Sequence, residues 1–187
     1  TVTINVTSVG AFANGSFENG PPTSFGAPQS WSATGVVTYF DATNYLPAAN
    51  NGTWMAVFNP GANTPAVSTL SQTFATVAGQ AYKVQFDAGM AGQAGKSQTL
   101  QAAVGGSSLF SQAFTSSGPT ATWSENLSFN FTASGPVTTL TFSVDITGLT
   151  PALNTDLLLD DVRITEVSTV NEAPVATADA YSVQAGS

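Results

Sequence analysis

The sequence alternates apolar and polar residues with a period of two in many short segments, and no segment of useful length shows a helical period. Successive side chains of a β-strand point to opposite sides, so this alternation is typical of strands that bury one face. Turn signals rich in Gly, Pro and Asn separate the segments. The pattern predicts an all-β protein of roughly ten strands. The expected strands are residues 1–9, 36–40, 54–58, 70–74, 82–86, 100–104, 107–114, 127–131, 140–146 and 157–167.

The length and composition predict one compact domain followed by a short tail. A chain of 187 residues with 42% hydrophobic residues can bury a sizeable core. Many strands with short turns favour a sandwich or a barrel, and we expect an antiparallel two-sheet jelly-roll sandwich over residues 1–169. Residues 170–187 lose the large apolar side chains and gain Pro and Ala, which predicts a linker or the start of a following domain.

The charge balance narrows the possible partners and the location. The net charge is −8 with only three Lys and Arg residues, and nucleic-acid binding needs clustered cations, so nucleic acid is not an expected partner. A charged fraction of 7%, against about 25% in an average globular protein, leaves Ser, Thr, Asn and Gln to cover the surface. Such a surface is typical of secreted bacterial modules, so we expect a secreted or cell-surface location. No apolar run approaches the roughly 18 residues of a membrane helix, and no membrane insertion is expected.

Asp160 is the residue that the strand pattern makes hardest to place. It has the parity of Leu158, Val162 and Ile164, so an unbroken strand would turn its carboxylate toward the core. A buried carboxylate without a partner costs several kcal/mol, roughly, in lost hydration. Ca²⁺ is one candidate partner, because it takes carboxylate and carbonyl oxygens without His or Cys. Hydrogen bonds from loop N–H groups, or an ion pair with Arg163, are the alternatives.

The residue types present do not favour an enzyme. Without His or Cys, a Ser-His-Asp or Cys-His catalytic site cannot form, and the ordinary zinc and copper sites are excluded. Two carboxylates could still hydrolyse a glycoside, but no pair stands out in the sequence. The acids considered are Glu18, Asp41, Asp87, Glu125 and Asp145. Lys83 is expected to face outward and not to act as a desolvated nucleophile.

Aromatic residues in loops and on strand faces indicate a possible carbohydrate site. The C–H faces of sugar rings stack on aromatic rings, while amide side chains bind the hydroxyl groups. The candidate residues are Tyr39, Tyr45, Trp54, Trp31, Trp123 and Asn44. Tyr45 is the first choice because it shares a polar loop with Asn44. The alternative for the others is ordinary packing in the core or at its edge, above all for Trp31.

Several short motifs resemble, in their order, those of galactose-binding-like jelly-roll domains. The motifs are Asn14-Gly15-Ser16-Phe17-Glu18, the Trp31 segment, Leu70 to Phe74, Val77 to Tyr82, Phe131-Thr132-Ala133 and Leu159-Asp160-Asp161-Val162. They are most similar to the domain-of-unknown-function 642 type and the bacterial choice-of-anchor type, which are similar in turn to carbohydrate-binding modules. The resemblance covers residues 10–168. The tail at Asn171 to Ala176 resembles the joints that precede cadherin-like repeats.

The resemblance implies a structural Ca²⁺ between the first loop and the last strand. In similar modules the ligands are the Glu of the first motif and the first Asp of the last motif, which are Glu18 and Asp160 here. Backbone carbonyl groups near Asn14 and Ser16 would supply further oxygens. Asp161, on the opposite face of the strand, is expected to be exposed to solvent.

Two functions from different classes remain. The first is a non-catalytic carbohydrate-binding module of a larger secreted or surface protein, whose partners are a polysaccharide or glycan and the other domains of the same chain. The second is a structural or adhesive β-sandwich domain without sugar binding. The two differ in whether the Trp and Tyr residues form an exposed platform, so the burial of these rings discriminates between them.

Overall fold

The computed structural model describes residues 10–19, 26–41, 49–58, 67–145 and 155–167. Within these ranges the chain forms ten β-strands, and it contains no helix long and apolar enough to cross a membrane. The strands are β1 (Ser32–Thr34), β2 (Val37–Asp41), β3 (Trp54–Phe58), β4 (Val67–Ala75), β5 (Ala81–Gly92), β6 (Ser97–Val104), β7 (Ser107–Thr115), β8 (Thr122–Thr132), β9 (Val137–Asp145) and β10 (Thr155–Glu166). The prediction of an all-β chain is confirmed.

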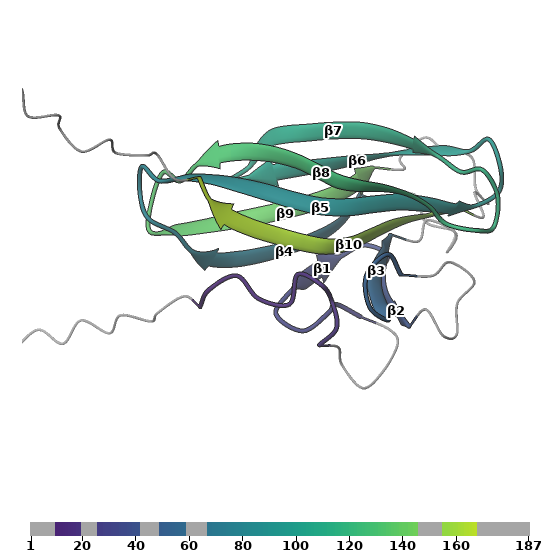
Figure 1. The fold of residues 1–187 in the computed structure, drawn as a ribbon, viewed down its shortest axis with the longest axis horizontal. Helices are drawn as coiled ribbons and strands as arrows, with labels where there is room; N and C mark the ends of the chain where they lie inside the picture. Colours follow the sequence, from purple (N-terminus) through teal and green to yellow (C-terminus); the bar gives the residue numbers. More distant parts are fainter. Residues whose placement is uncertain (1–9, 20–25, 42–48, 59–66, 146–154, 168–187) are drawn as a thin grey trace, which may run out of the picture.

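The strands form two five-stranded antiparallel sheets that pack face to face (Figure 1). Sheet A has the order β1-β4-β9-β6-β7, and sheet B has the order β2-β3-β10-β5-β8. Strands that are neighbours in sequence often lie in different sheets, as β3 and β4 do, or β7 and β8. This crossing between layers is that of a jelly-roll sandwich, so the predicted fold class is confirmed.

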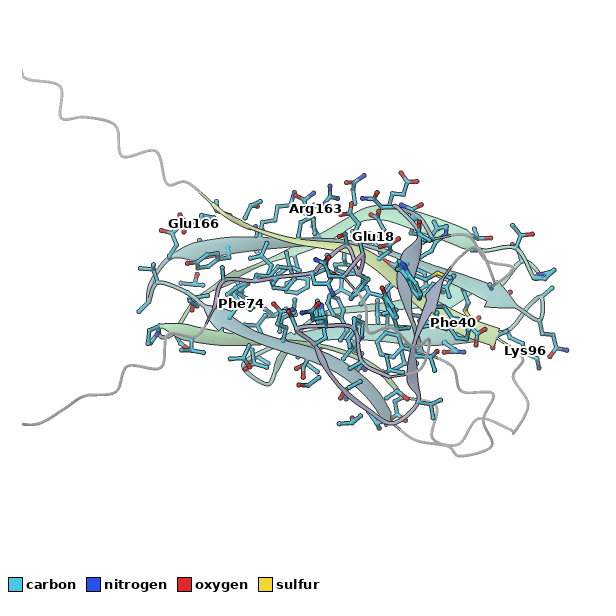
Figure 2. All side chains as sticks on the ribbon, turned by 90° about the horizontal axis from the view of Figure 1, so that it is seen from below. Glu18, Phe40, Phe74, Lys96, Arg163 and Glu166 are labelled. Atoms are coloured by element: carbon cyan, nitrogen blue, oxygen red, sulfur yellow. The ribbon has the colours of Figure 1, made fainter. Side chains whose placement is uncertain are left out.

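The core lies between the two sheets, where the alternating apolar residues of both layers meet. Phe86 of β5 and Phe142 of β9 pack edge to face across the layers, with ring centroids 5.1 Å apart. Side chains fill this layer along the length of the sandwich, whereas Arg163 and Glu166 point away from it (Figure 2). Each large side chain buried here contributes about 1.5–3 kcal/mol, which is the main source of stability in a chain without disulfides.

The structure adds one strand near the beginning of the chain, and the predicted segments at both ends lie outside its described residues. Strand β1 was not predicted, because three residues are too few to show an alternation, and this strand depends on its pairing with β4 through Ser32 and Ser71. The strand predicted at residues 1–9 lies outside the described residues. The same holds for the tail at residues 170–187 and for the domain boundary at residue 169.

The predicted direction of the Asp160 side chain is wrong, because β10 contains a β-bulge. The pairing of β10 with β5 shifts between Asp160 and Arg163, and Asp161 adopts a left-handed backbone conformation with φ 48°. A bulge inserts one extra residue and reverses the alternation beyond it. Val162 therefore reaches the inter-sheet core, whereas Asp160 shares the outer face of sheet B with Leu158.

Residues 14–19 contact β10 directly after this bulge. The N–H of Val162 donates a 2.8 Å hydrogen bond to the carbonyl oxygen of Gly15. A Cβ atom on Gly15 would overlap the carbonyl group of Val162 and would lie 2.8 Å from the Phe12 ring. Glycine is therefore required where the first described loop contacts the last strand.

We expect Gly15→Ala to lower the free energy of unfolding by about 1–3 kcal/mol, because the added methyl group must displace backbone. Chemical denaturation measures this loss. Gly135→Ala is the matched control, since its Cβ atom would meet nothing within 4 Å and should change stability by no more than about 0.5 kcal/mol. Equal stability of the two variants would contradict the close approach of the loop to β10.

Candidate functional site

The outward face of sheet B, which is the side turned away from sheet A, carries a second apolar cluster. Met55, Val57, Ala91 and Leu158 form this cluster and are almost completely buried. The partly buried side chains of Phe40, Ala49, Ala121 and Trp123 pack against it. Polar side chains lie at the margins of this covered apolar face, and the candidate site is there.

Trp123 lies over the backbone of sheet B at one margin of the cluster. It pairs with Gly89 across β8 and β5, and a Cβ atom on Gly89 would lie 2.9 Å from Cδ2 of the indole. The absence of a side chain at Gly89 therefore makes room for the ring. The Trp123 side chain is half-buried, so one part rests on the sheet and another part remains accessible to solvent.

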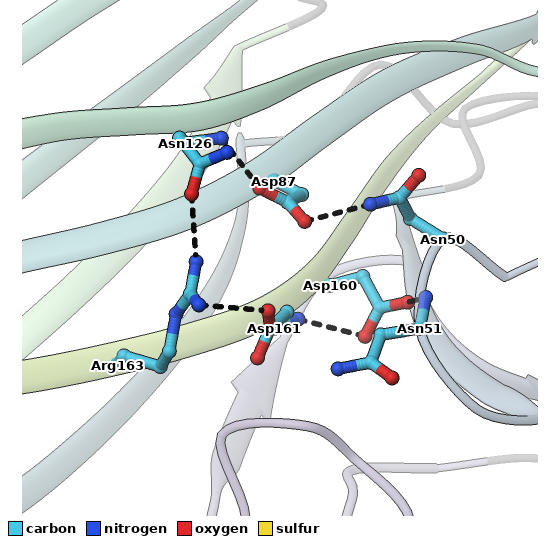
Figure 3. Close-up of polar contacts among 7 residues, drawn as sticks. All are labelled: Asn50, Asn51, Asp87, Asn126, Asp160, Asp161 and Arg163. Carbon is cyan, nitrogen blue, oxygen red and sulfur yellow. Dashed lines mark hydrogen bonds and ion pairs between the residues drawn. The ribbon is translucent and has the colours of Figure 1, made fainter.

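Two buried carboxylates, Asp160 and Asp87, lie beside the cluster as cross-strand neighbours on β10 and β5. Asp160 is 0% exposed, and each of its oxygens accepts one backbone N–H: Oδ2 from Asn51 at 2.8 Å and Oδ1 from Asp161 at 2.7 Å (Figure 3). Of the alternatives for this carboxylate, the structure shows hydrogen bonds from N–H groups.

Asp87 is held in a similar way from the other side. Its Oδ1 accepts the backbone N–H of Asn126 at 2.7 Å, and its Oδ2 accepts the side-chain amide of Asn50 at 2.7 Å. Arg163 then donates to Oδ1 of Asn126 at 3.1 Å and pairs with Asp161 at 3.4 Å (Figure 3). The predicted alternative in which Arg163 pairs with Asp160 is therefore not what the structure shows. Asp161 was expected to be exposed to solvent. In its pair with Arg163 the side chain is only 16% exposed.

Burial raises the pKa of two carboxylates on this face, Asp160 and Asp156. Desolvation raises the pKa of Asp160 to about 7, although hydrogen bonds from the backbone of Asn51, Asp161 and Asn50 act in the opposite direction. Desolvation also raises the pKa of Asp156 to about 6. These two acids therefore cost stability when they ionise in the folded protein.

Glu18 and Asp160, the two predicted metal ligands, reach opposite ends of one short loop. Oε1 of Glu18 accepts the backbone N–H groups of Thr53 and Trp54, both at 2.9 Å, whereas Asp160 accepts that of Asn51. A Cβ atom on Gly52 would overlap the Glu18 carboxylate. The first loop and the last strand do meet, as expected, and they meet around residues 51–54.

The other two predicted oxygen donors differ in their availability. The carbonyl oxygen of Asn14 already accepts the indole N–H of Trp31 at 2.9 Å and the N–H of Phe17 at 3.3 Å. Ser16 is half-buried in the same loop. Two carboxylates aimed at one loop fit a hard cation, because each keeps lone pairs beyond those used. In the part of the chain that the structure describes, no three acidic side chains gather into a metal-binding group.

The predicted sugar-stacking residues are placed very differently from one another. Trp31 is 6% exposed and Tyr39 is 0% exposed, so neither presents a ring face to a ligand. Trp54 is half-buried. One face of its ring is stacked on Tyr39, with ring centroids 4.2 Å apart and an angle of 3° between the ring planes. Tyr45 and Asn44 lie outside the described residues. Trp54 and Trp123 therefore remain as described candidates, on opposite sides of sheet B.

Sequence reasoning missed the role of Asp87, Asn50 and Asn126. The alternation does turn Asp87 outward, but outward does not mean exposed here, because side chains cover this face. The available signal is the composition of the outward positions after it, Gly89 and Ala91. Small and apolar residues at those positions indicate a covered face, and Asp87 is accordingly only 4% exposed.

Comparisons with known proteins agree with the fold. No protein-family model matches the chain, and no curated protein matches it. A similar solved structure is the carbohydrate-binding module TmCBM61 in complex with β-1,4-galactotriose, at 20% identity and a TM-score of 0.54 over 86% of this chain and 100% of that chain. The K2 cleaved adhesin domain of Lys-gingipain is similar at 14% identity and a TM-score of 0.53, over 80% of this chain and 95% of that chain. The tandem CBM22 domains of Paenibacillus barcinonensis Xyn10C have 14% identity and a TM-score of 0.51, over 92% of this chain and 49% of that chain. At these identities the likeness shows the jelly-roll fold.

We expect stability to fall as the pH rises from about 4 to about 6. Burial raises the pKa of Asp156 from its ordinary value of 3.8 to about 6 in the folded protein, so the folded state binds more protons across that window. In Asp156→Asn, the decrease in unfolding free energy across this pH range should be smaller than in the unchanged protein, by about 3 kcal/mol at most. Urea titrations at several pH values, without divalent cations, measure this.

Glu166→Gln, at an exposed carboxylate on the same strand, is the control for that comparison. It should leave the pH dependence as in the unchanged protein. If Asp156→Asn kept the full decline, burial of Asp156 would not be its cause.

Proposed function

We propose that this chain is a non-catalytic carbohydrate-binding module of a larger secreted or surface protein. The observation that carries this proposal is Trp123, whose indole is supported by the sheet at Gly89 and partly open to solvent. An aromatic ring fixed on one side is the surface on which a sugar ring stacks through its C–H groups. The resemblance of the sequence to galactose-binding-like jelly-roll domains, which are similar in turn to carbohydrate-binding modules, supports the same function.

Polar side chains near Trp123 suit the hydroxyl groups of a neutral glycan. Asn126 and Asn51 are exposed, and Asn50 is half-buried. Asn126 is fixed by Arg163, which leaves its amide group in a defined orientation. Amides that can both donate and accept are the usual partners of sugar hydroxyls. A platform with fixed amides beside it therefore fits a polysaccharide segment that lies against the edge of sheet B.

The proposal excludes catalysis by the buried acids. Asp87 and Asp160 are cross-strand neighbours, but their oxygens accept N–H groups and both side chains are buried. A glycoside hydrolase needs two carboxyl groups that reach the scissile bond from opposite sides. Neither acid is placed to touch a substrate, so their role is to hold the loop at residues 50–54 and the β8 backbone at Asn126, where the β5–β8 register shifts.

A structural Ca²⁺ is part of the proposal. Glu18 and Asp160 would hold the ion, with a main-chain oxygen near Ser16 as a further ligand and without the Asn14 carbonyl, which is already engaged. The ion would supply positive charge next to a carboxylate that burial otherwise leaves partly protonated near neutral pH. The ion would then strengthen the junction of the first loop, the loop at residues 51–54 and β10.

We expect Trp123→Ala to weaken binding to polysaccharides at least about 10-fold, because truncating an aromatic anchor costs about 2 kcal/mol. Affinity electrophoresis in gels that contain galactans, xylans or other plant and algal polysaccharides provides the measurement. Trp54→Ala is the matched control on the other side of sheet B. A circular dichroism melt of both variants separates loss of binding from loss of folding.

The outcomes of that experiment are distinct. Loss of binding in Trp54→Ala alone would move the site to the β2–β3 edge and would contradict the assignment to Trp123. If no polysaccharide of the panel slowed the migration of the unchanged protein, the carbohydrate function itself would be contradicted.

We expect Ca²⁺ to raise the melting temperature by roughly 5–10 °C over the protein in chelator, as saturating binding to the folded state alone would. Glu18→Gln and Asp160→Asn should abolish the shift, and Glu166→Gln should keep it. An identical melting temperature in chelator and in millimolar Ca²⁺ would rule out the ion.

A structural or adhesive domain without sugar binding is the second candidate. The observation that favours it is the neutral outward face of sheet A, where pairs of hydroxyl groups link neighbouring strands. Thr73 and Thr139 lie 2.8 Å apart across β4 and β9, and Ser97 and Thr115 lie 2.7 Å apart across β6 and β7. Such a face suits contact with another protein more than recognition of a small ligand.

A further inference from the structure

The two sheets differ sharply in charge, although they have five strands each. The strands of sheet B contain most of the charged residues of the described chain, including Lys83, Asp87, Asp160 and Arg163. In the described strands of sheet A the charged residue is Asp145, at the end of β9. With a net charge of −8, two copies of this protein repel one another on most approaches. Sheet A is the side on which they meet with least repulsion.

Strand β7 forms one edge of this neutral sheet. It pairs with β6, and no other strand among the described residues pairs with its second side. Natural edge strands are usually protected by charged residues, by Pro or by very short length. The nine residues Ser107–Thr115 contain neither a charged residue nor Pro. Their protection is a single bulge at the end near Leu109, where the β6–β7 register shifts, and the rest of the strand is regular.

The other sheet edges are better protected. Strand β1 has three residues, and the neighbouring part of β4 is covered by the chain at residues 10–13, where Gly10 accepts the N–H of Ala75 at 3.0 Å. In sheet B, β2 is five residues long and ends at Asp41. Strand β8 contains Glu125 and a register shift opposite Asp87. Among the edge strands that the structure describes, β7 is therefore the one without such protection.

Apolar surface adjoins the same edge. Leu109 is 43% exposed and Val137 is 42% exposed. Both line an open cavity of about 430 Å³ between the β6–β7 turn and the β8–β9 turn, and none of its lining residues is charged. Exposed aliphatic side chains beside an unpaired neutral strand are typical of a surface that another chain covers.

We propose that β7 pairs with β7 of a second copy of this chain. The two strands run antiparallel about a twofold axis, which joins two copies of sheet A into one continuous sheet. The pairing that uses the whole strand places Ser107 opposite Thr115 of the other copy and puts Ser111 at the axis, opposite itself. This association is independent of the carbohydrate function and leaves the outward face of sheet B, with Trp123, free.

Single cysteines test this arrangement directly, because the chain contains no Cys. Ser111→Cys should form a disulfide-linked dimer under mild oxidation, since residues paired across antiparallel strands lie within the reach of a disulfide bond. Ser32→Cys, exposed on β1 at the opposite edge of sheet A, should stay monomeric on a non-reducing gel. Equal cross-linking of the two variants, or none in either, would overturn the proposal.

A charge substitution gives a second readout that does not depend on the register. In sedimentation velocity, the unchanged protein should shift from monomer to dimer with rising concentration, and Ser111→Lys should remain monomeric. Ser32→Lys changes the net charge equally and should still dimerise. A monomer at all concentrations, or a dimer that persists in Ser111→Lys, would contradict pairing through β7, and matching thermal melts show that the variants are folded.

Discussion

The bulge in β10 is the local feature on which the arrangement of the candidate site depends. The left-handed conformation of Asp161 lets one strand serve two faces, with Leu157, Leu159 and Val162 in the core and Asp160 outside it. Without the extra residue, either Val162 would leave the core or Asp160 would enter it. The carboxylate is placed instead beneath the loop at residues 50–54, where two backbone N–H groups compensate part of its lost hydration.

Three acidic side chains link elements that are far apart in the chain. Glu18, Asp87 and Asp160 come from the first described loop, β5 and β10, and all three accept hydrogen bonds from residues 50–54. Cross-strand hydrogen bonds fix the sheets themselves, and these three side chains add contacts from the loop to the first described loop, to β5 and to β10. A cation at this junction would act on the same contacts, so stability and any ligand site near the loop are coupled physically.

The sequence predicts the fold well because period-two alternation and turn residues are local signals. It also predicts that Asp160 is buried, as the structure shows. It does not predict the bulge, since one inserted residue leaves the composition unchanged and only shifts the parity. Nor does it predict the burial of Tyr39 or the covering of Asp87, which depend on contacts between segments far apart in sequence.

The central claim is that Trp123, supported on one side by sheet B, binds a glycan through the part of its ring that is open to solvent. The three Trp residues give three indole N–H signals in a ¹H–¹⁵N NMR spectrum, and Trp31 serves as an internal control because its indole N–H is bonded to Asn14 inside the fold. During titration with a soluble oligosaccharide of the polysaccharide that is bound, we expect the Trp123 signal to shift and the Trp31 signal to stay in place. A shift of the Trp54 signal without that of Trp123, or no shift in any of the three, would contradict the claim.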